Sequence, residues 1–345
     1  MAVQRECADV LRIFKVVRAI RYRGHFAARL DPLGRSLGPL REGYERVEAA
    51  VPEDGADIAR LLEGYPDELF LRGRRVTPAQ YLGLHNTAPG RKFFFGSELA
   101  TLDPSGLGRK KWWSLDEVLT RCAEVYTGTL TAEYNHISSV HKKRWLMGRL
   151  EGFQAGRSGW LTKDERRAVL RRLIRADTLE TFLGQRFPSA KRFGLEGAEA
   201  TIPGIQAVVD AAGGVGTESI VVGMAHRGRL NILNSVFGKP LGAICTEMKS
   251  EGRSTFNVGD VRYHLGTRTM AQLEGTIEGE PGPRVELSMA PNPSHLEAVN
   301  AVVAGMVRSK QMKIDPGRGG RSRTAQRKVL ALLLHGRDAA PRIGP

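Results

Sequence analysis

The chain has 345 residues, of which 41% are hydrophobic and 26% are charged, which is ordinary for a globular protein large enough for two domains. No apolar run approaches the roughly 20 residues of a membrane span, which argues against an integral membrane protein. The three cysteines lie far apart and fit no metal-binding spacing, so we expect reduced thiols.

The net charge of +15 is unevenly distributed along the chain. Residues 308–345 hold ten basic and two acidic side chains, whereas elsewhere the basic excess is spread over helical faces such as "DERRAVLRRLIR". The aromatic residues that mark the strands of RNA-binding sheets are missing. We therefore expect no specific nucleic-acid function, while non-specific attraction of polyanions by the basic tail stays open as an alternative.

Residues 1–30 are expected to form a helix that Gly24 ends. One face of this helix is apolar and carries Val10, Ile13, Phe14, Val17 and Ile20. The segment is rich in arginine, like an organellar transit peptide, but Glu6 and Asp9 are unusual in such peptides. Because no clear targeting peptide is visible, we expect a cytoplasmic location in a bacterium, or the mitochondrial matrix in a eukaryote.

Residues 31–113 show little periodicity and recurrent glycine and proline, so loops and short helices are expected there. Capping boxes predict the starts of two later helices, at Ser114-x-x-Glu117 and Thr162-x-x-Glu165. In each box the hydroxyl accepts a hydrogen bond from one free helical N–H and the carboxylate accepts from another. We assign residues 1–190 to a mainly helical N-terminal region.

Three short apolar runs follow, "SIVVGM" at 219–224, "RVELSM" at 284–289 and "KVLALLLHG" at 328–336, with helical segments between them. This pattern is typical of parallel strands that helices cover on both faces. The predicted fold class is therefore α/β, with an incomplete parallel-sheet domain over residues 191–345. Its last part, 313–345, is expected to be a divergent basic tail that is flexible over 313–327.

A polar cluster follows each apolar run, and open α/β sheets bind ligands at the carboxyl ends of their strands. His226 and Arg227 follow the first run, Ser294 follows the second, and His264 lies between the two. Each also has a purely structural interpretation: a histidine bonded to backbone, an arginine paired with a carboxylate, and a capping box from Ser294 to Glu297. The concentration of histidines favours a site for proton transfer and donation to substrate oxygens, whereas their spacing fits no histidine-bound metal.

Six segments together resemble one enzyme family, the thiamine-diphosphate-dependent decarboxylating first component of the 2-oxoglutarate dehydrogenase complex. In chain order they read "RYRGHFAARLDPLG", "YTGTLTAEYNHISSVHKKRWLMGRLE", "KRFGLEGAEATIPGIQAVVD", "GMAHRGRLNILNSVFGK", "GDVRYHLG" and "APNPSHLEAVNAVVAGMVRSKQ". The resemblance covers most of residues 12–40 and 115–312 and is weak across 41–113. The order and separation of six motifs make it highly specific.

The resemblance implies oxidative decarboxylation of 2-oxoglutarate with thiamine diphosphate, a reaction of the tricarboxylic acid cycle. The succinyl unit would then pass to the lipoyl group of a succinyltransferase partner, and the family is usually homodimeric. By resemblance, His226 and His264 are catalytic and bind substrate. Ser294 would touch substrate and cofactor, and Arg227 and Leu296 would lie at the cofactor.

The sequence departs from this family at the expected metal loop. The family reads His-Gly-Asp-Ala-Ala there, followed by a glycine-rich stretch and an asparagine, and its Asp and Asn hold the magnesium ion on the diphosphate. This chain reads "HGRDAAPRIGP", so Arg337 displaces the magnesium ligand Asp338. We expect a truncated form that has lost much of its affinity for cofactor and magnesium. Whether it is a frameshift, a fragment or a natural short form stays open, and an alternative is an inactive chain that acts only through assembly with partners.

Overall fold

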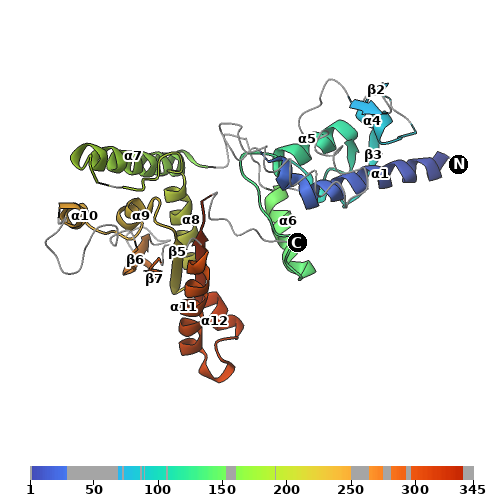
Figure 1. The fold of residues 1–345 in the computed structure, drawn as a ribbon. Helices are drawn as coiled ribbons and strands as arrows, with labels where there is room; N and C mark the ends of the chain where they lie inside the picture. The colour runs from blue at the N-terminus through green and yellow to red at the C-terminus, as the bar shows by residue number, and fades with distance from the viewer. Residues whose placement is uncertain are drawn as a thin grey trace. The chain divides into compact units, whose positions relative to one another are not determined.

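The chain forms two compact units, Met1–Trp160 and Leu161–Pro345 (Figure 1). The computed structural model describes residues 2–28, 69–71, 74–85, 88, 90–105, 108–152, 161–190, 192–249, 264–274, 281–292 and 297–336. Within these ranges no helix is both long and apolar enough to cross a membrane.

The first unit combines helices with two small antiparallel hairpins. Its helical elements are α1 (Ala2–Arg23), η1 (Gly24–Ala27), α4 (Pro78–Tyr81), η2 (Ala100–Leu102), α5 (Leu115–Tyr126) and α6 (Val140–Gly152). Its hairpins pair β1 (Leu69–Leu71) with β2 (Arg74–Val76) and β3 (Lys92–Phe94) with β4 (Trp112–Ser114). Both hairpins lie where only loops and short helices were expected. The second is stabilised by a buried cross-strand aromatic pair, Phe93 opposite Trp113.

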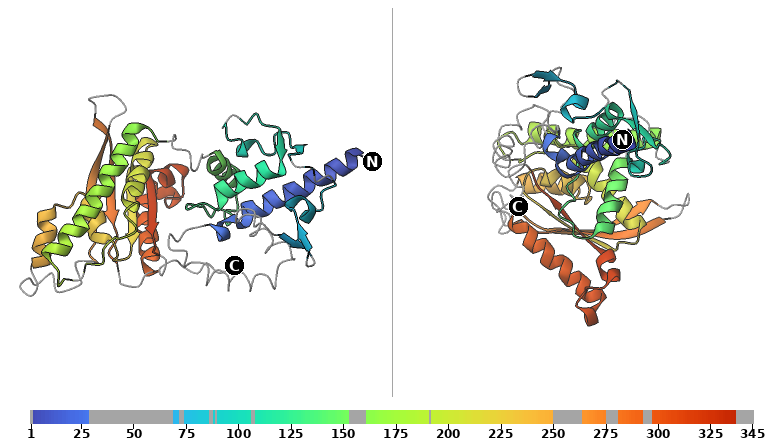
Figure 2. Two further views of the ribbon diagram at one scale, coloured as in Figure 1. Left: turned by 90° about the horizontal axis from the view of Figure 1, so that it is seen from above. Right: turned by 90° about the vertical axis from the view of Figure 1, so that its right-hand side faces the viewer.

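The predicted N-terminal helix is confirmed as α1. Ile13, Val17 and Ile20 are fully buried, and α1 lies alongside α5 (Figure 2). The helix ends before Gly24, where a Cβ atom would lie 2.7 Å from the Cβ of Tyr126 on α5. A glycine is therefore needed at this point for the two helices to approach so closely.

Both predicted capping boxes are present. The hydroxyl of Ser114 accepts from the N–H of Glu117 at 3.2 Å, and the Glu117 carboxylate accepts from the N–H of Ser114 at 2.8 Å. Thr162 and Glu165 make the same reciprocal pair at 3.2 and 2.7 Å. The two boxes satisfy otherwise free N–H groups at the first turns of α5 and of α7 (Lys163–Arg186).

A buried carboxylate on α6, that of Glu151, joins α1 and α5. Arg21 donates to its two oxygens at 2.7 and 2.9 Å, and the Tyr126 hydroxyl donates at 2.5 Å. Burial alone would lower the pKa of Arg21, but the hydrogen bond and the charge of Glu151 outweigh it and raise the pKa. Burial and the same carboxylate raise the pKa of Tyr126. The Arg21 guanidinium therefore stays charged inside the unit.

Replacement of Glu151 tests this ion pair. Glu151→Gln keeps the side-chain shape but leaves the Arg21 guanidinium buried without a counter-charge, so we expect the free energy of unfolding to fall by about 3 kcal/mol. Urea denaturation followed by circular dichroism measures the change. Glu124→Gln is the matched control, because Glu124 is 49% exposed in its pair with Arg121 and should cost under about 0.5 kcal/mol. Equal losses in the two variants would contradict a structural role for the buried pair.

The second unit places helices around one four-stranded sheet. Its helical elements are α7 (Lys163–Arg186), α8 (Thr201–Gly214), α9 (Arg229–Ser235), α10 (Leu241–Lys249), α11 (Ala298–Ile314), η4 (Pro316–Arg318) and α12 (Arg323–Lys328). Its strands are β5 (Ser219–Met224), β6 (Thr267–Glu274), β7 (Pro281–Met289) and β8 (Val329–Leu334).

The order of strands in the sheet is β6-β7-β5-β8. The strand β5 is parallel to both β7 and β8, which confirms the parallel arrangement predicted for the three apolar runs. The fourth strand, β6, pairs antiparallel with β7 at the edge and was not predicted. Its sequence "TRTMAQLE" is mostly polar because an edge strand is only partly covered.

Alternate residues of β5 pack into two different hydrophobic clusters. Ile220, Val222 and Met224 belong to the cluster that contains apolar side chains of α7, α8 and α9. Val221 packs instead with Val299 and Val303 of α11. Successive strand residues point to opposite faces, so helices cover both sides of β5, and Figure 1 shows α8 and α11 beside it. The predicted α/β class is confirmed.

The domain boundary and the structure of one segment differ from what the sequence predicts. The units divide after Trp160 rather than at residue 190, since α7 packs against α8 and α9 of the second unit. The segment 313–327, expected to be flexible, instead contains the end of α11, then η4 and the start of α12. The side chains of Asp315 and Ser322 cap η4 and α12 by accepting from the N–H groups of Arg318 and Ala325 at 3.3 and 3.2 Å.

Glu286 of β7 collects hydrogen bonds from several directions. Lys310 of α11 and Arg268 of β6 both donate to its carboxylate, and the Ser288 hydroxyl donates at 2.9 Å. The Ser219 hydroxyl of β5 donates at 3.3 Å. Partial burial alone would raise the pKa of Glu286, but the bonds from Lys310, Arg268 and Ser288 outweigh it and lower the pKa to about 2.

The second unit should therefore lose stability in acid through Glu286. Since the pKa falls on folding from 4.5 to about 2, the stabilisation is complete above pH 4.5 and disappears as the pH drops toward 2. The thermal unfolding midpoint of Glu286→Gln should lie below that of the unaltered chain at pH 7, and the gap should close below pH 3. Glu218→Gln, which removes an exposed partner of Lys328, is the control and should leave the acid dependence unchanged.

Candidate active site

The polar clusters of the sequence meet at one edge of the sheet. Because β5, β7 and β8 are parallel, their carboxyl ends point the same way, and each leads directly into one of the three clusters. The first strand delivers His226, the second Asn292 and the third His335. The β5 and β7 ends are also joined side by side, since the N–H of Ala290 donates to the carbonyl of Val222 at 2.8 Å. This edge is where an α/β sheet builds its ligand site.

The two histidines singled out in the sequence lie next to each other here. The rings of His226 and His264 have centroids 5.9 Å apart and meet edge to face at 73°. His226 is also packed against the ring of Phe193, at 4.3 Å and 52°. Both histidines are half-buried, so each has one part held by neighbours and another part accessible to a ligand.

The backbone around His226 is fixed from two sides. The N–H of Gly228 donates to the carbonyl of Phe193 at 2.7 Å, and the N–H of Arg229 donates to the carbonyl of His226 at 3.1 Å. Phe193 has a φ of 44°, the one positive value outside glycine among the described residues. Such a conformation is costly for a large side chain and persists only where neighbours enforce it. The strained Phe193 therefore supports both the turn and the ring of His226.

The central residue of this edge is Arg229, which is not among the site residues predicted from the sequence. Its side chain is fully buried and donates to three backbone carbonyls. Those of Met224 and Ala290, at the ends of β5 and β7, accept at 3.2 and 2.7 Å. That of Leu265, before β6, accepts at 2.7 Å from Nη2. Burial lowers the pKa of Arg229 to about 10, so it remains protonated at neutral pH.

Asn292 forms a second link between the same segments. Its N–H donates to the carbonyl of His264 at 2.9 Å, and its side-chain amide donates to the carbonyl of Met224 at 3.0 Å. Asn292 is almost fully buried. Together with Arg229 it ties the segment that carries His264 to the ends of β5 and β7. The only sequence signal for either residue is its place within a motif that also contains the predicted site residues.

Of the other residues predicted for the site, one is exposed and the rest lie outside the described residues. Arg227 is exposed beside His226, and no carboxylate among the described residues pairs with it. Ser294 and Leu296 lie outside the described residues, and so do Asp338 and the inserted Arg337. Their assignments, including the capping box expected at Ser294, stay predictions. The helix α11 that follows begins at Ala298, without a side-chain cap from Glu297.

His335, at the end of β8, adds a third imidazole to the edge. Its Nε2 lies 2.8 Å from Oδ1 of Asn300 in the first turn of α11. Its Nδ1 is buried and has no hydrogen-bond partner in the described part of the chain. A buried polar atom without a partner is unusual in a folded protein, so this nitrogen is available to a polar group near the end of β8.

The described donors suit an anion better than a hard cation. Magnesium prefers carboxylate and carbonyl oxygens, but the amides of Asn292 and Asn300 already make internal hydrogen bonds. Across the described ranges no cluster of three histidine, cysteine or acidic side chains is suited to a metal. Imidazole N–H groups and the exposed Arg227 instead match the carboxylates and phosphates of small ligands.

Comparison with known proteins agrees with the motifs. No protein-family model matches the chain. The 2-oxoglutarate dehydrogenase E1 component of Brucella anthropi is 36% identical to it over a 341-residue alignment that covers 96% of this chain and 29% of that protein. The E1 components of Brucella canis and Brucella abortus are also 36% identical over 96% of this chain and 28% of their own length.

The chain resembles 2-oxoglutarate dehydrogenase E1 components along almost its whole length. The family resemblance expected from the six motifs is thereby confirmed, and the relatives are oxidoreductases by name. The chain spans less than a third of the length of these relatives. The similarity also extends through residues 41–113, where the motifs alone carried little signal.

Loss of the Arg229 guanidinium should be far more damaging than loss of its exposed neighbour. Arg229→Met removes a donor from three carbonyls, of which that of Met224 also accepts from Asn292, and we expect the free energy of unfolding to fall by about 3 kcal/mol. Arg229→Lys should recover only part of the lost stability, because one ammonium group cannot reach all three carbonyls. Urea denaturation measures the stability of both variants. Arg227→Met is the control, and its free energy of unfolding should fall by under about 0.5 kcal/mol. A normal denaturation midpoint for Arg229→Met would show that other donors replace it.

Proposed function

We propose that this chain carries one side of the substrate and cofactor site of an enzyme that decarboxylates 2-oxoglutarate and transfers the succinyl unit to a lipoyl group. The observation that carries the proposal is the pair of adjacent histidines, His226 and His264, at the carboxyl edge of the sheet. The similarity to E1 components over 96% of the chain supports the reaction class.

The two imidazoles would bind the substrate and move protons. Thiamine diphosphate, when bound, supplies the carbanion that attacks the keto carbon and the electron sink for loss of carbon dioxide. His226 and His264 would each donate an N–H to a substrate oxygen, and imidazole can exchange that proton near neutral pH. Their half-buried positions strengthen such bonds, because less water competes for the donors.

The neighbouring residues would hold the anionic groups. Arg227, exposed beside His226, would attract the diphosphate or a substrate carboxylate. Ser294 and Leu296 are proposed to touch the substrate and the cofactor. Asp338 is proposed as one magnesium ligand, although Arg337 displaces it in the sequence. Arg229 and Asn292 would act only by positioning the segments that carry the two histidines.

The proposed partners are those of the relatives' complex, a lipoyl-bearing succinyltransferase and a second copy of the chain. A second candidate function is an inactive chain that acts only through assembly with such partners, which the interrupted "HGRDAA" motif favours. Polyanion binding by the basic tail is less well supported. One of its cations, Lys328, is already paired with Glu218.

Calorimetric titration of the 345-residue chain tests the proposed site. We expect 2-oxoglutarate to bind, and His226→Gln and His264→Gln each to weaken binding by about tenfold, since each removes a hydrogen bond to a charged group. His141→Gln, in the first unit, is the control and should bind normally. Unchanged affinity in both site variants would contradict the proposal.

The same titration with thiamine diphosphate and magnesium separates the two candidate functions. We expect weak cofactor binding and little release of carbon dioxide from 2-oxoglutarate, because Arg337 interrupts the metal loop. Micromolar cofactor binding together with carbon dioxide release would overturn this expectation and favour an active enzyme. Co-purification with a longer homologue in the absence of turnover would favour the assembly role.

A further inference from the structure

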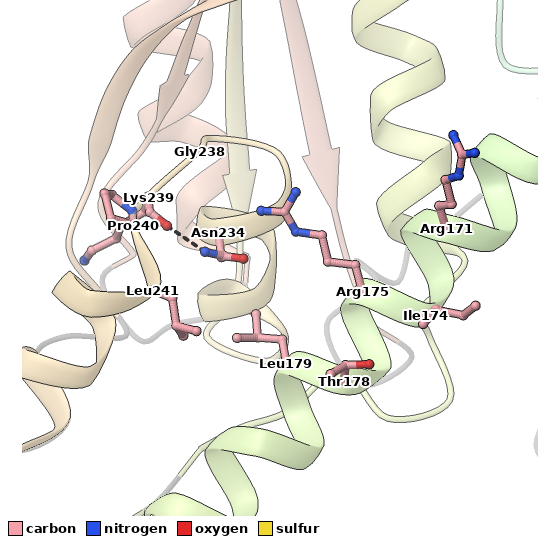
Figure 3. A pocket seen from close by; sticks show the side chains of 10 residues that line it. All are labelled: Arg171, Ile174, Arg175, Thr178, Leu179, Asn234, Gly238, Lys239, Pro240 and Leu241. Atoms are coloured by element: carbon pink, nitrogen blue, oxygen red, sulfur yellow. Dashed lines mark hydrogen bonds between the residues drawn. The ribbon is translucent and has the colours of Figure 1, made fainter.

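The second unit contains a cavity that shares no residue with the sheet edge. Its volume is about 520 Å³, and it lies between α7 and the chain that joins α9 to α10 (Figure 3). Five of its lining residues are on α7, at Arg171, Ile174, Arg175, Thr178 and Leu179. The others are Asn234, Gly238, Lys239, Pro240 and Leu241. This volume falls in the range of small-molecule sites, about 300–1,000 Å³.

Two guanidinium groups at this cavity have no counter-charge among the residues that the structure describes. Arg171 and Arg175 are one helical turn apart on α7 and exposed, and neither pairs with a carboxylate in the part of the chain that the structure describes. Figure 3 shows the Arg175 guanidinium extending from α7 toward Gly238 and Asn234. The third cation, Lys239, is already neutralised by Glu247 at 2.6 and 2.8 Å. The available charge at the cavity is therefore that of the two arginines.

The opposite wall offers an oriented hydrogen-bond acceptor. The side-chain nitrogen of Asn234 donates to the carbonyl of Lys239 at 2.7 Å, and the residue is only 8% exposed. This bond fixes the amide so that its oxygen faces α7 (Figure 3). The turn depends on Gly238, whose φ of 71° lies in the left-handed region. The N–H of Lys239 then donates to the carbonyl of Leu233 at 2.9 Å, which closes the end of α9.

The rest of the wall is apolar. Ile174 is 56% exposed and Leu241 is 37% exposed, although both are large hydrophobic side chains. Leu179 and Pro240 extend the same surface. Burial of such surface by a ligand is favourable at about 25 cal/mol per Å², so an apolar body bound here would add to the attraction of the arginines.

We propose that this cavity binds a small organic anion, a phosphate or carboxylate group attached to an apolar body. The anionic group would accept from Arg175, with Arg171 adding charge, because a guanidinium binds such groups through two parallel hydrogen bonds. A donor on the ligand would reach the Asn234 oxygen, and its apolar body would lie on Ile174 and Leu241. The proposal is independent of the function proposed for the sheet edge.

Titration of the full chain with phenyl phosphate tests this site. We expect saturable binding, with inorganic phosphate and benzyl alcohol each binding more weakly because each has only half of the recognised chemistry. Arg175→Gln should raise the dissociation constant by about tenfold, since it removes a charged donor. Leu241→Ala should raise it by about threefold through lost apolar contact. Circular dichroism confirms that the variants, both on the surface of the cavity, remain folded.

Two control variants make the result decisive. Arg186→Gln removes one charge from the same helix outside the cavity, and His226→Gln alters the sheet edge, so both should bind phenyl phosphate normally. Equal weakening by Arg175→Gln and Arg186→Gln would indicate general charge attraction and overturn the proposal. Weakening by His226→Gln alone would place the ligand at the sheet edge and overturn it too. Absence of saturable binding, or equal affinity for inorganic phosphate and phenyl phosphate, would also overturn the proposal.

Discussion

The buried guanidinium of Arg229 is the contact on which the candidate site depends. A charged group removed from water costs several kcal/mol unless hydrogen bonds replace its solvation. Here the carbonyls of Met224, Ala290 and Leu265 supply those bonds at the ends of two strands and a loop, and the Met224 carbonyl also accepts from Asn292. The charge and the three carbonyls therefore stabilise one another. The segments that carry His226 and His264 are held together as a consequence.

This arrangement gives the site a rigid base and a polar surface. Phe193, in a strained conformation, packs against the ring of His226, which also meets the ring of His264 edge to face. Its surface presents two half-buried imidazoles and the exposed Arg227, groups that suit small anionic ligands. The resemblance to 2-oxoglutarate dehydrogenase E1 components is consistent with such ligands, whereas the described residues contain no oxygen-rich shell for magnesium.

Local patterns predicted the elements whose causes are local. The apolar face of α1 and the capping boxes at Ser114 and Thr162 depend on residues within a few positions of one another, and all were found as expected. The three parallel strands were predicted because both of their faces are buried, which leaves continuous apolar runs. The strand β6 was missed because an edge position tolerates a polar sequence, and η4 and α12 were missed because their short caps lie in a basic, low-complexity stretch.

The sequence by itself determined the α/β class, the positions of the parallel strands and the family resemblance, and it predicted His226 and His264 as site residues. These features follow from periodicity and from motifs of adjacent residues. Only the tertiary structure showed that Arg229 and Asn292 join β5, β7 and the segment before β6, since their partners lie up to 68 residues away. The tertiary structure alone also showed that Arg175 and Asn234 line one cavity. Carbonyl acceptors carry no side-chain signature, so such long-range bonds cannot be read from residue types.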